Sequence, residues 1–389
     1  MMSAVLGTYN RRDVSFSKGK GCYLYAVNGD QYLDFVSGIA VNSLGHCHEH
    51  LVRTVQKQAE NLWHVSNAFI IPEQERLAQR LADHTFADYA VFMNSGAEAT
   101  EASIKIARKY FHELGKPEKN RIITFAGAFH GRTLAALFAA NNPEHVKGFG
   151  PKVDGFDQVP FADHDALKKA INSSTAAIMV ESIFGEGGVK VLPNECLVGL
   201  KKLCEQHDIL LILDEVQCGV GRTGKFFAFE WAGIEPDIVP IAKGIGGGFP
   251  IGACLVNKKV SIGMKPGTHG STFGGNPLAM SVANAVLDII LEKGFLEKVQ
   301  LVGNYFEEQL KKLQHKYPNV ISDVRGKGLL RGIQIKGDSV QFLDQLFKNK
   351  MLGVKASENV IRLLPPLIVT KKEIDEGINI LEKTAKEFI

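Results

Sequence analysis

The sequence has no long apolar run, no strong excess of either charge and no closely spaced pair of cysteines. Without an apolar run long enough to cross a bilayer, a membrane-spanning protein is not expected. The 389 residues include 45 Lys and Arg against 42 Asp and Glu, a net charge of +3 without a basic cluster, which argues against nucleic acid as a partner. The six cysteines lack a C-x-x-C pair, as is typical of reduced thiols in a cytosolic protein.

Two patterns near the N-terminus suggest functions that their surroundings do not support. Arg11 and Arg12 could begin a twin-arginine export signal, but polar and glycine-rich residues follow where an apolar segment is needed. Residues 45–50, GHCHEH, look like a metal cluster, but alternating ligands on so short a loop do not converge easily on one ion. We therefore expect a cytoplasmic protein without a metal site, in which this loop leads into a helix at 51–62.

What is present is an alternation of strands and helices. The stretch 21–35, centred on Asn28 and Gly29, predicts a β-hairpin. An alternation of helices with buried strands predicts a mostly parallel, doubly wound α/β sheet, followed by a smaller α/β lobe beyond residue 276. The expected strands lie at 90–93, 122–125, 176–181, 209–213, 238–242, 252–256, 329–335 and 360–364, and the expected helices at 72–81, 98–114, 196–207, 276–293, 295–316, 339–350 and 371–388.

The stretch 209–250 carries the strongest chemical signal. Its first apolar run ends in Asp214 and Glu215, and Lys243 directly follows the next strand. Strands buried on both faces of a parallel sheet end at a common edge, which is where ligands of open α/β folds bind. Pyridoxal phosphate needs a Lys for a Schiff base and an acid against its pyridine nitrogen, and this stretch supplies both.

Two nucleotide-binding motifs compete for the same stretch. Residues 219–224 spell G-x-G-x-x-G, and residues 219–225 spell G-x-x-x-x-G-K. In a dinucleotide site the strand turns directly into a helix, whereas residues 214–217 intervene here. A P-loop needs Ser or Thr after its Lys to reach magnesium, and Phe226 stands at that position. A nicotinamide oxidoreductase that uses these glycines remains an alternative from another class of enzyme.

Two further turns fit a cofactor that carries a phosphate. The strand, small-residue turn and helix at 90–114 would place free backbone N–H groups and the positive end of a helix dipole at the sheet edge. Phe129 could stack on a flat ring, and Arg132 has the planar fork that binds a carboxylate through two hydrogen bonds. Taken singly, these features are also what ordinary connectivity, core packing and a surface ion pair would produce.

The chain resembles the class III (subgroup II) pyridoxal-phosphate aminotransferases nearly from end to end. The motifs that carry the resemblance are NSLGHCHEHL, NLWHVSNAF, MNSGAEATEASIKIARKY, GAFHGRTLAAL, GEGGV, LLILDEVQCGVGRTGKFFAFE, IAKGIGGGFPIGA, GTHGSTFGGNPLA, VRGKGLLRGIQI and VIRLLPPL. The resemblance implies pyridoxal 5′-phosphate as cofactor and a fold type I transferase with a large sheet domain and a smaller α/β domain. We expect residues 1–55 to join the small domain and a subunit contact, 56–290 to form the large cofactor-binding domain, and 291–389 the small domain.

The resemblance also assigns the cofactor contacts. Lys243 would bind the cofactor covalently and move the proton between substrate and cofactor carbons. Asp214 would keep the pyridine nitrogen protonated, Val216 and Phe129 would hold opposite ring faces, and Gln217 would bond the ring hydroxyl. Further contacts are expected from Ser95, Gly96, Ala97, Glu215 and Thr272. In the family this threonine comes from the partner subunit, so each active site implies a homodimer.

Substrate contacts follow from the same resemblance. Arg132 would bind a carboxylate of either substrate, and Arg362 would bind the α-carboxylate of glutamate. Glu186 resembles the family's gate, which pairs with that second arginine when the amine substrate is bound, and Ser271 would contact the far end of that amine. The motifs are most similar to those of members that transfer an amino group from N2-acetylornithine to 2-oxoglutarate in arginine biosynthesis. Ornithine, succinylornithine, N-succinyl-diaminopimelate and 4-aminobutyrate are alternative amines, and a non-catalytic cofactor carrier is the other alternative.

The sequence departs from the family pattern at two places. Ser182 follows Glu181 where proline is common, and Phe273 stands where tyrosine is common. We expect these changes to affect the substrate pocket and to leave the cofactor chemistry intact.

Overall fold

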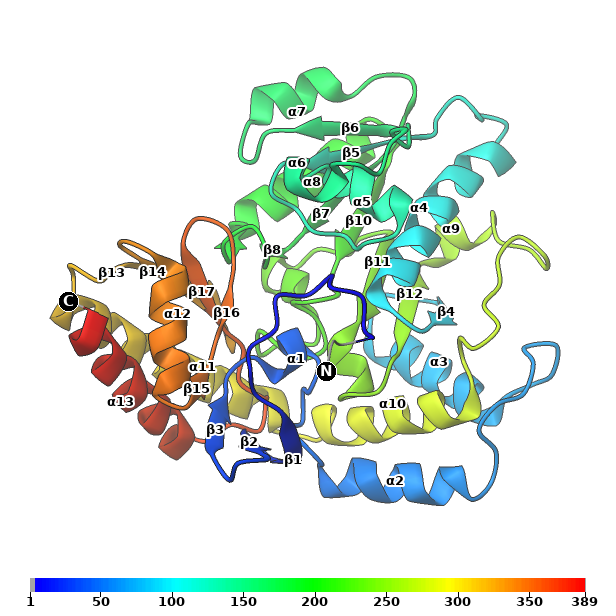
Figure 1. Ribbon diagram of the computed structural model, residues 1–389. Helices are drawn as coiled ribbons and strands as arrows, with labels where there is room; N and C mark the ends of the chain where they lie inside the picture. The colour runs from blue at the N-terminus through cyan, green and yellow to red at the C-terminus, as the bar shows by residue number, and fades with distance from the viewer. Residues whose placement is uncertain (1–3, 389) are drawn as a thin grey trace.

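A seven-stranded sheet forms the centre of the computed structural model, which describes residues 4–388 (Figure 1). Its strand order is β4-β12-β11-β10-β7-β5-β6, and β12 runs antiparallel to both of its neighbours, while the other paired strands are parallel. The strands are β4 (Tyr89–Met93), β5 (Arg121–Phe125), β6 (Phe156–Val159), β7 (Thr175–Glu181), β10 (Leu210–Asp214), β11 (Ile238–Ala242) and β12 (Gly252–Val256). The predicted mostly parallel α/β sheet is confirmed.

The central strand β10 is buried on both faces, as its continuous apolar run predicts. Leu211 and Leu213 belong to one hydrophobic cluster, and Leu210 and Ile212 belong to another. Because successive side chains of a strand point to opposite faces, the two clusters are the two layers that enclose the sheet. Helices α4 (Gly96–Glu113) and α8 (Asn194–Gln206) are among those that pack against its strands.

Two smaller four-stranded sheets flank the central one. The first has the order β1-β2-β3-β15 and the second β13-β14-β17-β16. Their strands are β1 (Phe16–Lys20), β2 (Tyr23–Ala26), β3 (Gln31–Asp34), β15 (Met351–Leu352), β13 (Ile321–Lys327), β14 (Leu330–Ile335), β17 (Val360–Leu363) and β16 (Val354–Lys355). The hairpin predicted around Asn28 and Gly29 is the antiparallel pair β2 and β3.

Long helices lie in the C-terminal part of the chain. Predicted helices at 295–316 and 371–388 are confirmed as α11 (Phe295–Lys316) and α13 (Lys371–Phe388), and none of the helices within residues 4–388 is long and apolar enough to cross a membrane. The other helices are α2 (Glu49–Ala59), α3 (Pro72–His84), α5 (Leu134–Ala140), α6 (Pro143–Val146), α7 (His164–Ala170), α9 (Lys258–Ser261), α10 (Pro277–Ile290) and α12 (Ser339–Lys348). A short hairpin, β8 (Ile183–Phe184) and β9 (Lys190–Val191), follows β7.

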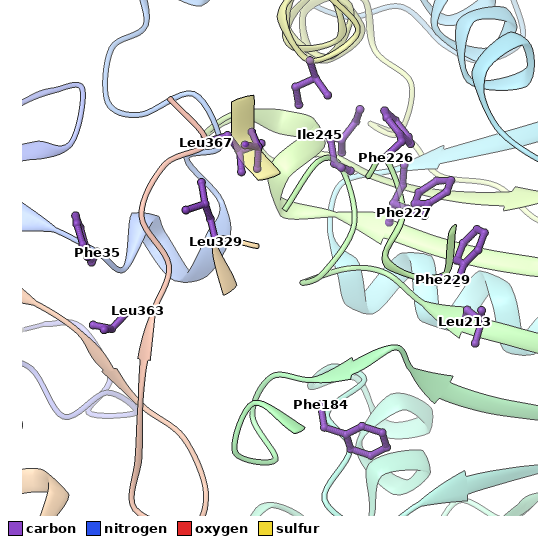
Figure 2. Packing of buried hydrophobic residues seen from close by; sticks show 14 of the residues in the cluster. Phe35, Phe184, Leu213, Phe226, Phe227, Phe229, Ile245, Leu329, Leu363 and Leu367 are labelled. Carbon is purple, nitrogen blue, oxygen red and sulfur yellow. The ribbon is translucent and has the colours of Figure 1, made fainter. Parts of the chain in front are cut away.

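The glycine-rich loop after β10 is part of the core. Phe226, Phe227 and Phe229 pack together beneath it, with ring centroids 4.9 Å and 5.1 Å apart for the two successive pairs (Figure 2). A Cβ atom at Gly219 would lie 2.7 Å from the carbonyl oxygen of Glu215, so a side chain there would collide with the loop itself. Close packing therefore accounts for a glycine of the nucleotide-like motif.

Two of the three histidines of residues 45–50 have separate partners. His46 Nε2 lies 2.7 Å from Asp34 Oδ2, and His50 Nε2 lies 2.9 Å from Asp288 Oδ2. The aspartate that binds His46 also accepts backbone N–H groups at the start of α1 (Ser37–Ala40), whose four residues all have φ between 50° and 66°. A run of left-handed residues is costly for L-amino acids, so this turn depends on such bonds.

Candidate active site

A cavity of about 540 Å³ opens at the carboxyl ends of β7, β10 and β11. It gathers nine of the predicted site residues, which come from four separate stretches of the chain. These are Ser95, Gly96, Ala97, Phe129, Arg132, Asp214, Val216, Gln217 and Lys243. The edge of the sheet therefore brings together the residues that the motifs suggested, as expected for a doubly wound fold.

Lys243 and Asp214 stand at the ends of neighbouring parallel strands. Asp214 is the last residue of β10, and Lys243 directly follows β11 with a positive φ of 48°. Burial and the nearby charge of Arg362 lower the pKa of Lys243, against the opposing charges of Glu186, Asp214 and Glu181. A lowered pKa increases the fraction of neutral amine, which is the form that acts as nucleophile and as base.

The start of α4 forms one wall of the cavity. Ser95 caps the helix, because its Oγ accepts the backbone N–H of Glu98 at 3.2 Å. A Cβ atom at Gly96 would lie 2.7 Å from Cγ1 of Val216, so glycine is needed for the helix to approach this close. The free N–H groups of the first turn and the helix dipole favour an anion at this position.

Phe129 and Arg132 line the cavity from the loop after β5. The guanidinium carbon of Arg132 lies 5.6 Å from the centre of the Phe129 ring, and its Nη2 lies 3.2 Å from Nε2 of His145. The Arg132 side chain thus reaches the cavity without a carboxylate partner among the ion pairs of residues 4–388. This leaves its planar fork available for a carboxylate ligand.

Arg362 is buried on β17 and is already paired. It is 1% exposed, its Nη2 lies 2.7 Å from Oε1 of Glu186, and its Nη1 donates to Oε1 of Gln217 at 2.9 Å. The pairing of Arg362 with Glu186 is the one that the family resemblance predicted. Gln217 stands between this pair and the cavity, so neither member of the pair lines the cavity itself.

Besides Arg362 and Glu186, three more predicted residues do not line this cavity. The carboxylate of Glu215 is fully buried and points into the loop, where it accepts hydrogen bonds from Ser182 Oγ at 2.6 Å and from Ala228 N–H at 2.9 Å. The bond from Ser182 to Glu215 is a consequence of the departure from the family pattern, because the proline that is common at position 182 has no hydroxyl group. Ser271 and Thr272 line a separate cavity beside α4, and the threonine is exposed.

Two residues at the cavity were missed by the sequence reasoning. His130 bonds Asp214 through Nδ1 at 2.8 Å, and Glu181 accepts the backbone N–H of Phe129 at 2.9 Å. Burial and the charge of Asp214 raise the pKa of Glu181 to about 7. The signals were available, since His130 lies between Phe129 and Arg132 in sequence and Glu181 ends a strand of the same sheet.

These residues fit pyridoxal phosphate. Lys243 offers an amine, Asp214 a buried carboxylate for the pyridine nitrogen, and Phe129 and Val216 apolar surfaces for the ring. Because Gly96 has no side chain, it can lie close to Val216, and the backbone N–H groups at the helix start remain open to a phosphate. When bound, the cofactor would supply the electron sink that an amine substrate needs to lose a proton from carbon.

The chain is similar to known proteins in sequence and in fold. Residues 8–385 match the family model described as Aminotransferase class-III. The acetylornithine aminotransferase of Agrobacterium fabrum is 55% identical over 97% of this chain and 95% of its own length. The structure of an acetylornithine aminotransferase from Elizabethkingia anophelis matches with a TM-score of 0.87 at 34% identity, covering 98% of this chain and 96% of that one.

An ornithine aminotransferase is more similar in fold than that enzyme, at nearly the same identity. A structure of the Toxoplasma gondii enzyme matches with a TM-score of 0.93 at 33% identity, covering 98% of this chain and 92% of that one. Its active site is described as holding pyridoxal phosphate at partial occupancy.

Proposed function

We propose, from the premise that this chain belongs to the class-III aminotransferase family, that it transfers the terminal amino group of N2-acetylornithine to 2-oxoglutarate. The products are N-acetylglutamate 5-semialdehyde and glutamate, in arginine biosynthesis in the cytoplasm. Family membership makes the chain a pyridoxal-phosphate-dependent transaminase. The choice of substrates rests on a difference between two arginines. Arg132 has no carboxylate partner and can bind one from a substrate, whereas Arg362 is paired with Glu186.

The two arginines suit two substrates that use one site in turn. N2-acetylornithine has one carboxylate, so Arg132 can bind it while Arg362 stays neutralised by Glu186. Glutamate has two carboxylates and needs both arginines. The side chain of Glu186 is 31% exposed, whereas that of Arg362 is 1% exposed. Glu186 is therefore the member of the pair that can move away and leave Arg362 free to bind a carboxylate.

The proton transfers fall to Lys243. Lys243 lines the cavity, and its lowered pKa would let its amine take the proton from the substrate carbon that bears the amino group and deliver it to the cofactor carbon. Asp214 would accept a hydrogen bond from the pyridine nitrogen and hold the proton there. Val216 and Phe129, which also line the cavity, would hold the two faces of the ring.

A homodimer with shared active sites is part of the proposal. Exposed apolar side chains gather near the loop that carries Thr272: Leu62, Trp63, Phe69, Ile70 and Phe273 are 47% to 82% exposed. Exposed apolar surface of this kind is typical of a protein interface. A second copy would cover it and receive Thr272 at its phosphate-binding end. Sedimentation of a Trp63→Asp variant as a monomer, with loss of cofactor affinity, is the expected result.

We also propose that the chain has two domains. Residues 1–55 and 291–389 together form the small domain, and residues 56–290 form the large one. The support for this division is the parallel pairing of β15 with β3, which joins the two ends of the chain in one sheet. Limited proteolysis should cut first in the connections nearest to these boundaries, at residues 60–71 after α2 and at residues 291–294 before α11.

The substrate is tested by measuring single half-reactions. The purified enzyme is mixed with N2-acetylornithine, ornithine, succinylornithine, N-succinyl-diaminopimelate or 4-aminobutyrate, and loss of the visible absorbance of the bound cofactor is followed. N2-acetylornithine should give the largest ratio of rate constant to half-saturation concentration. A larger ratio for ornithine, whose aminotransferases share this fold, would contradict the proposal.

A further inference from the structure

The turn at residues 185–189, which carries Glu186, packs on the four-stranded sheet β13-β14-β17-β16. Val189 of this turn is fully buried and belongs to the same hydrophobic cluster as residues of β14 and β17. A Cβ atom at Gly332 of β14 would lie 2.9 Å from Cγ2 of Val189, so the glycine makes room for the valine. Arg362 lies on β17 of this sheet. The two members of the ion pair are therefore supported by one sheet.

The backbone of the turn is held in a conformation that it would not adopt freely. Val189 has φ of 55° and Gly188 has φ of 103°. A β-branched residue at positive φ is a strong outlier, which persists only where the surrounding structure imposes it. A Cβ atom at Gly188 would lie 3.2 Å from the carbonyl oxygen of Ser357, so the turn lies directly against the segment between β16 and β17.

Two hydrogen bonds fix the turn to the sheet. The backbone N–H of Ser357 donates to the carbonyl oxygen of Glu186 at 2.9 Å. Nη1 of Arg325, on β13, donates to the carbonyl oxygen of Gly188 at 3.3 Å. The backbone of Glu186 is thus bound in place, whereas its side chain is partly exposed.

Glu358 links both sides of this contact through its carboxylate. Its Oε1 lies 2.5 Å from Nζ of Lys190, which follows the turn, and its Oε2 lies 2.8 Å from Nη1 of Arg325. Arg325 also pairs with Asp323 at 2.6 Å. A single exposed ion pair contributes little, but several charges that form a network can hold a geometry.

We propose that Glu358 is a positioning residue for Glu186, because it ties the turn to the sheet that carries Arg362. The inference rests on the proposed function, in which Glu186 neutralises Arg362 while the amine substrate is bound. With the turn held, Glu186 reaches Arg362 or leaves it by rotation of its side chain alone. With the turn loosened, the pair forms less often, and Arg362 keeps an uncompensated charge beside the amine substrate.

The first test compares the two half-reactions in Glu358→Gln, which keeps the length of the side chain and removes its charge. The N2-acetylornithine half-reaction should slow about 2- to 5-fold, as for the loss of a partly exposed ion-pair network, and the glutamate half-reaction should keep its rate. The difference from the wild type should shrink as sodium chloride is added, because salt screens exposed charges. Glu308→Gln, at an exposed ion pair on α11, is the control and should change neither rate.

The second test asks whether Glu358 acts through the turn. Lys190→Gln removes the other end of the contact, so it should slow the same half-reaction by no more than Glu358→Gln does. Because both substitutions break one contact, the double variant should be no slower than Glu358→Gln alone. Losses that multiply in the double variant would show that the two residues act independently, which contradicts the proposal.

The third test needs no substrate. Backbone hydrogen exchange in peptides that cover residues 183–192 should be faster in Glu358→Gln than in the wild type or Glu308→Gln, because local opening of the turn no longer breaks the network. Unchanged exchange, or equal slowing of both half-reactions, would overturn the proposal. If the wild type does not use N2-acetylornithine while exchange still rises in Glu358→Gln, the proposed function is wrong and the anchoring of the turn is supported.

Discussion

The two ends of the active site are built in different ways. At the cofactor end, Asp214 is the last residue of one strand of the central sheet, and Lys243 and Ser95 follow two others within two residues, so strand pairing alone brings them together. At the substrate end, Arg362 comes from a different sheet and is held by other side chains. Backbone topology thus fixes the chemistry, whereas side-chain pairing sets the substrate. Gln217 joins the two ends, because it lines the cavity and accepts a hydrogen bond from Nη1 of Arg362.

The largest effect should come from removing the amine at the cofactor end. Lys243→Ala should lower kcat for every amine by about 10³-fold or more, because positioned proton transfer alone contributes on the order of 10² to 10⁴. Rates of both half-reactions check this, with Lys258→Ala on the exposed start of α9 as control. A loss of rate in only one of the two half-reactions would contradict the assignment of Lys243 to the cofactor end.

The next largest effect should come from the buried arginine. Arg362→Lys keeps the charge but loses the planar fork, so KM for 2-oxoglutarate should rise about 10- to 100-fold. KM for the amine should change little. Arg132→Lys is the matched variant and should raise both values, and thermal unfolding of each shows whether it is folded. An equal rise for both substrates in the Arg362 variant is the result that would contradict this assignment.

A smaller effect should come from the carboxylate that holds Arg362. Glu186→Gln leaves the arginine without a countercharge when the amine is bound, so the amine half-reaction should slow on the order of 10-fold, equivalent to about 1.4 kcal/mol. The glutamate half-reaction should keep its rate. Glu195→Gln on α8 is the control. If both half-reactions slow to the same extent, Glu186 does not discriminate between the substrates.

The smallest effect should be that of the buried carboxyl group of Glu215 on the unfolding temperature. Burial raises the pKa of Glu215 to about 7, so ionisation opposes folding, and stability from this group is present at low pH and lost as pH rises through 7. In Glu215→Gln this loss disappears. The variant should unfold at a lower temperature than the wild type because its amide meets N–H donors, and the gap should narrow as pH rises. A gap that widens with pH would show that Glu215 is ionised throughout.

The cofactor end could be predicted from sequence for a physical reason. Buried strands are continuous apolar runs, and residues just past them must meet at one edge of a parallel sheet. The same logic placed β10 and β11 and their ends correctly. It failed for β1, whose residues 16–20 are mostly exposed and show no apolar alternation, and for β13, in which polar residues predominate.

Side-chain partnerships were harder to foresee. Glu215 adjoins Asp214 in sequence, but strand alternation turns it away from the cavity toward Ser182 and the loop at 228–229. His130 and Glu181 lie beside Asp214 only because three separate segments of the chain come together in the fold. No local sequence pattern predicts that contact. The Arg362 and Glu186 pair was predicted from the family resemblance and not from any spacing in the chain.

The pairing of β15 with β3 also sets an order of events during synthesis. The first sheet of the chain receives its fourth strand from residues 351–352, more than three hundred positions downstream. Further along, Leu364 N–H bonds the carbonyl of Phe35, and Leu367 N–H bonds that of Ser43. The first sheet thus stays incomplete until residues 351–352 have been made, and Phe35 and Ser43 gain these backbone partners only after residues 364 and 367 have followed.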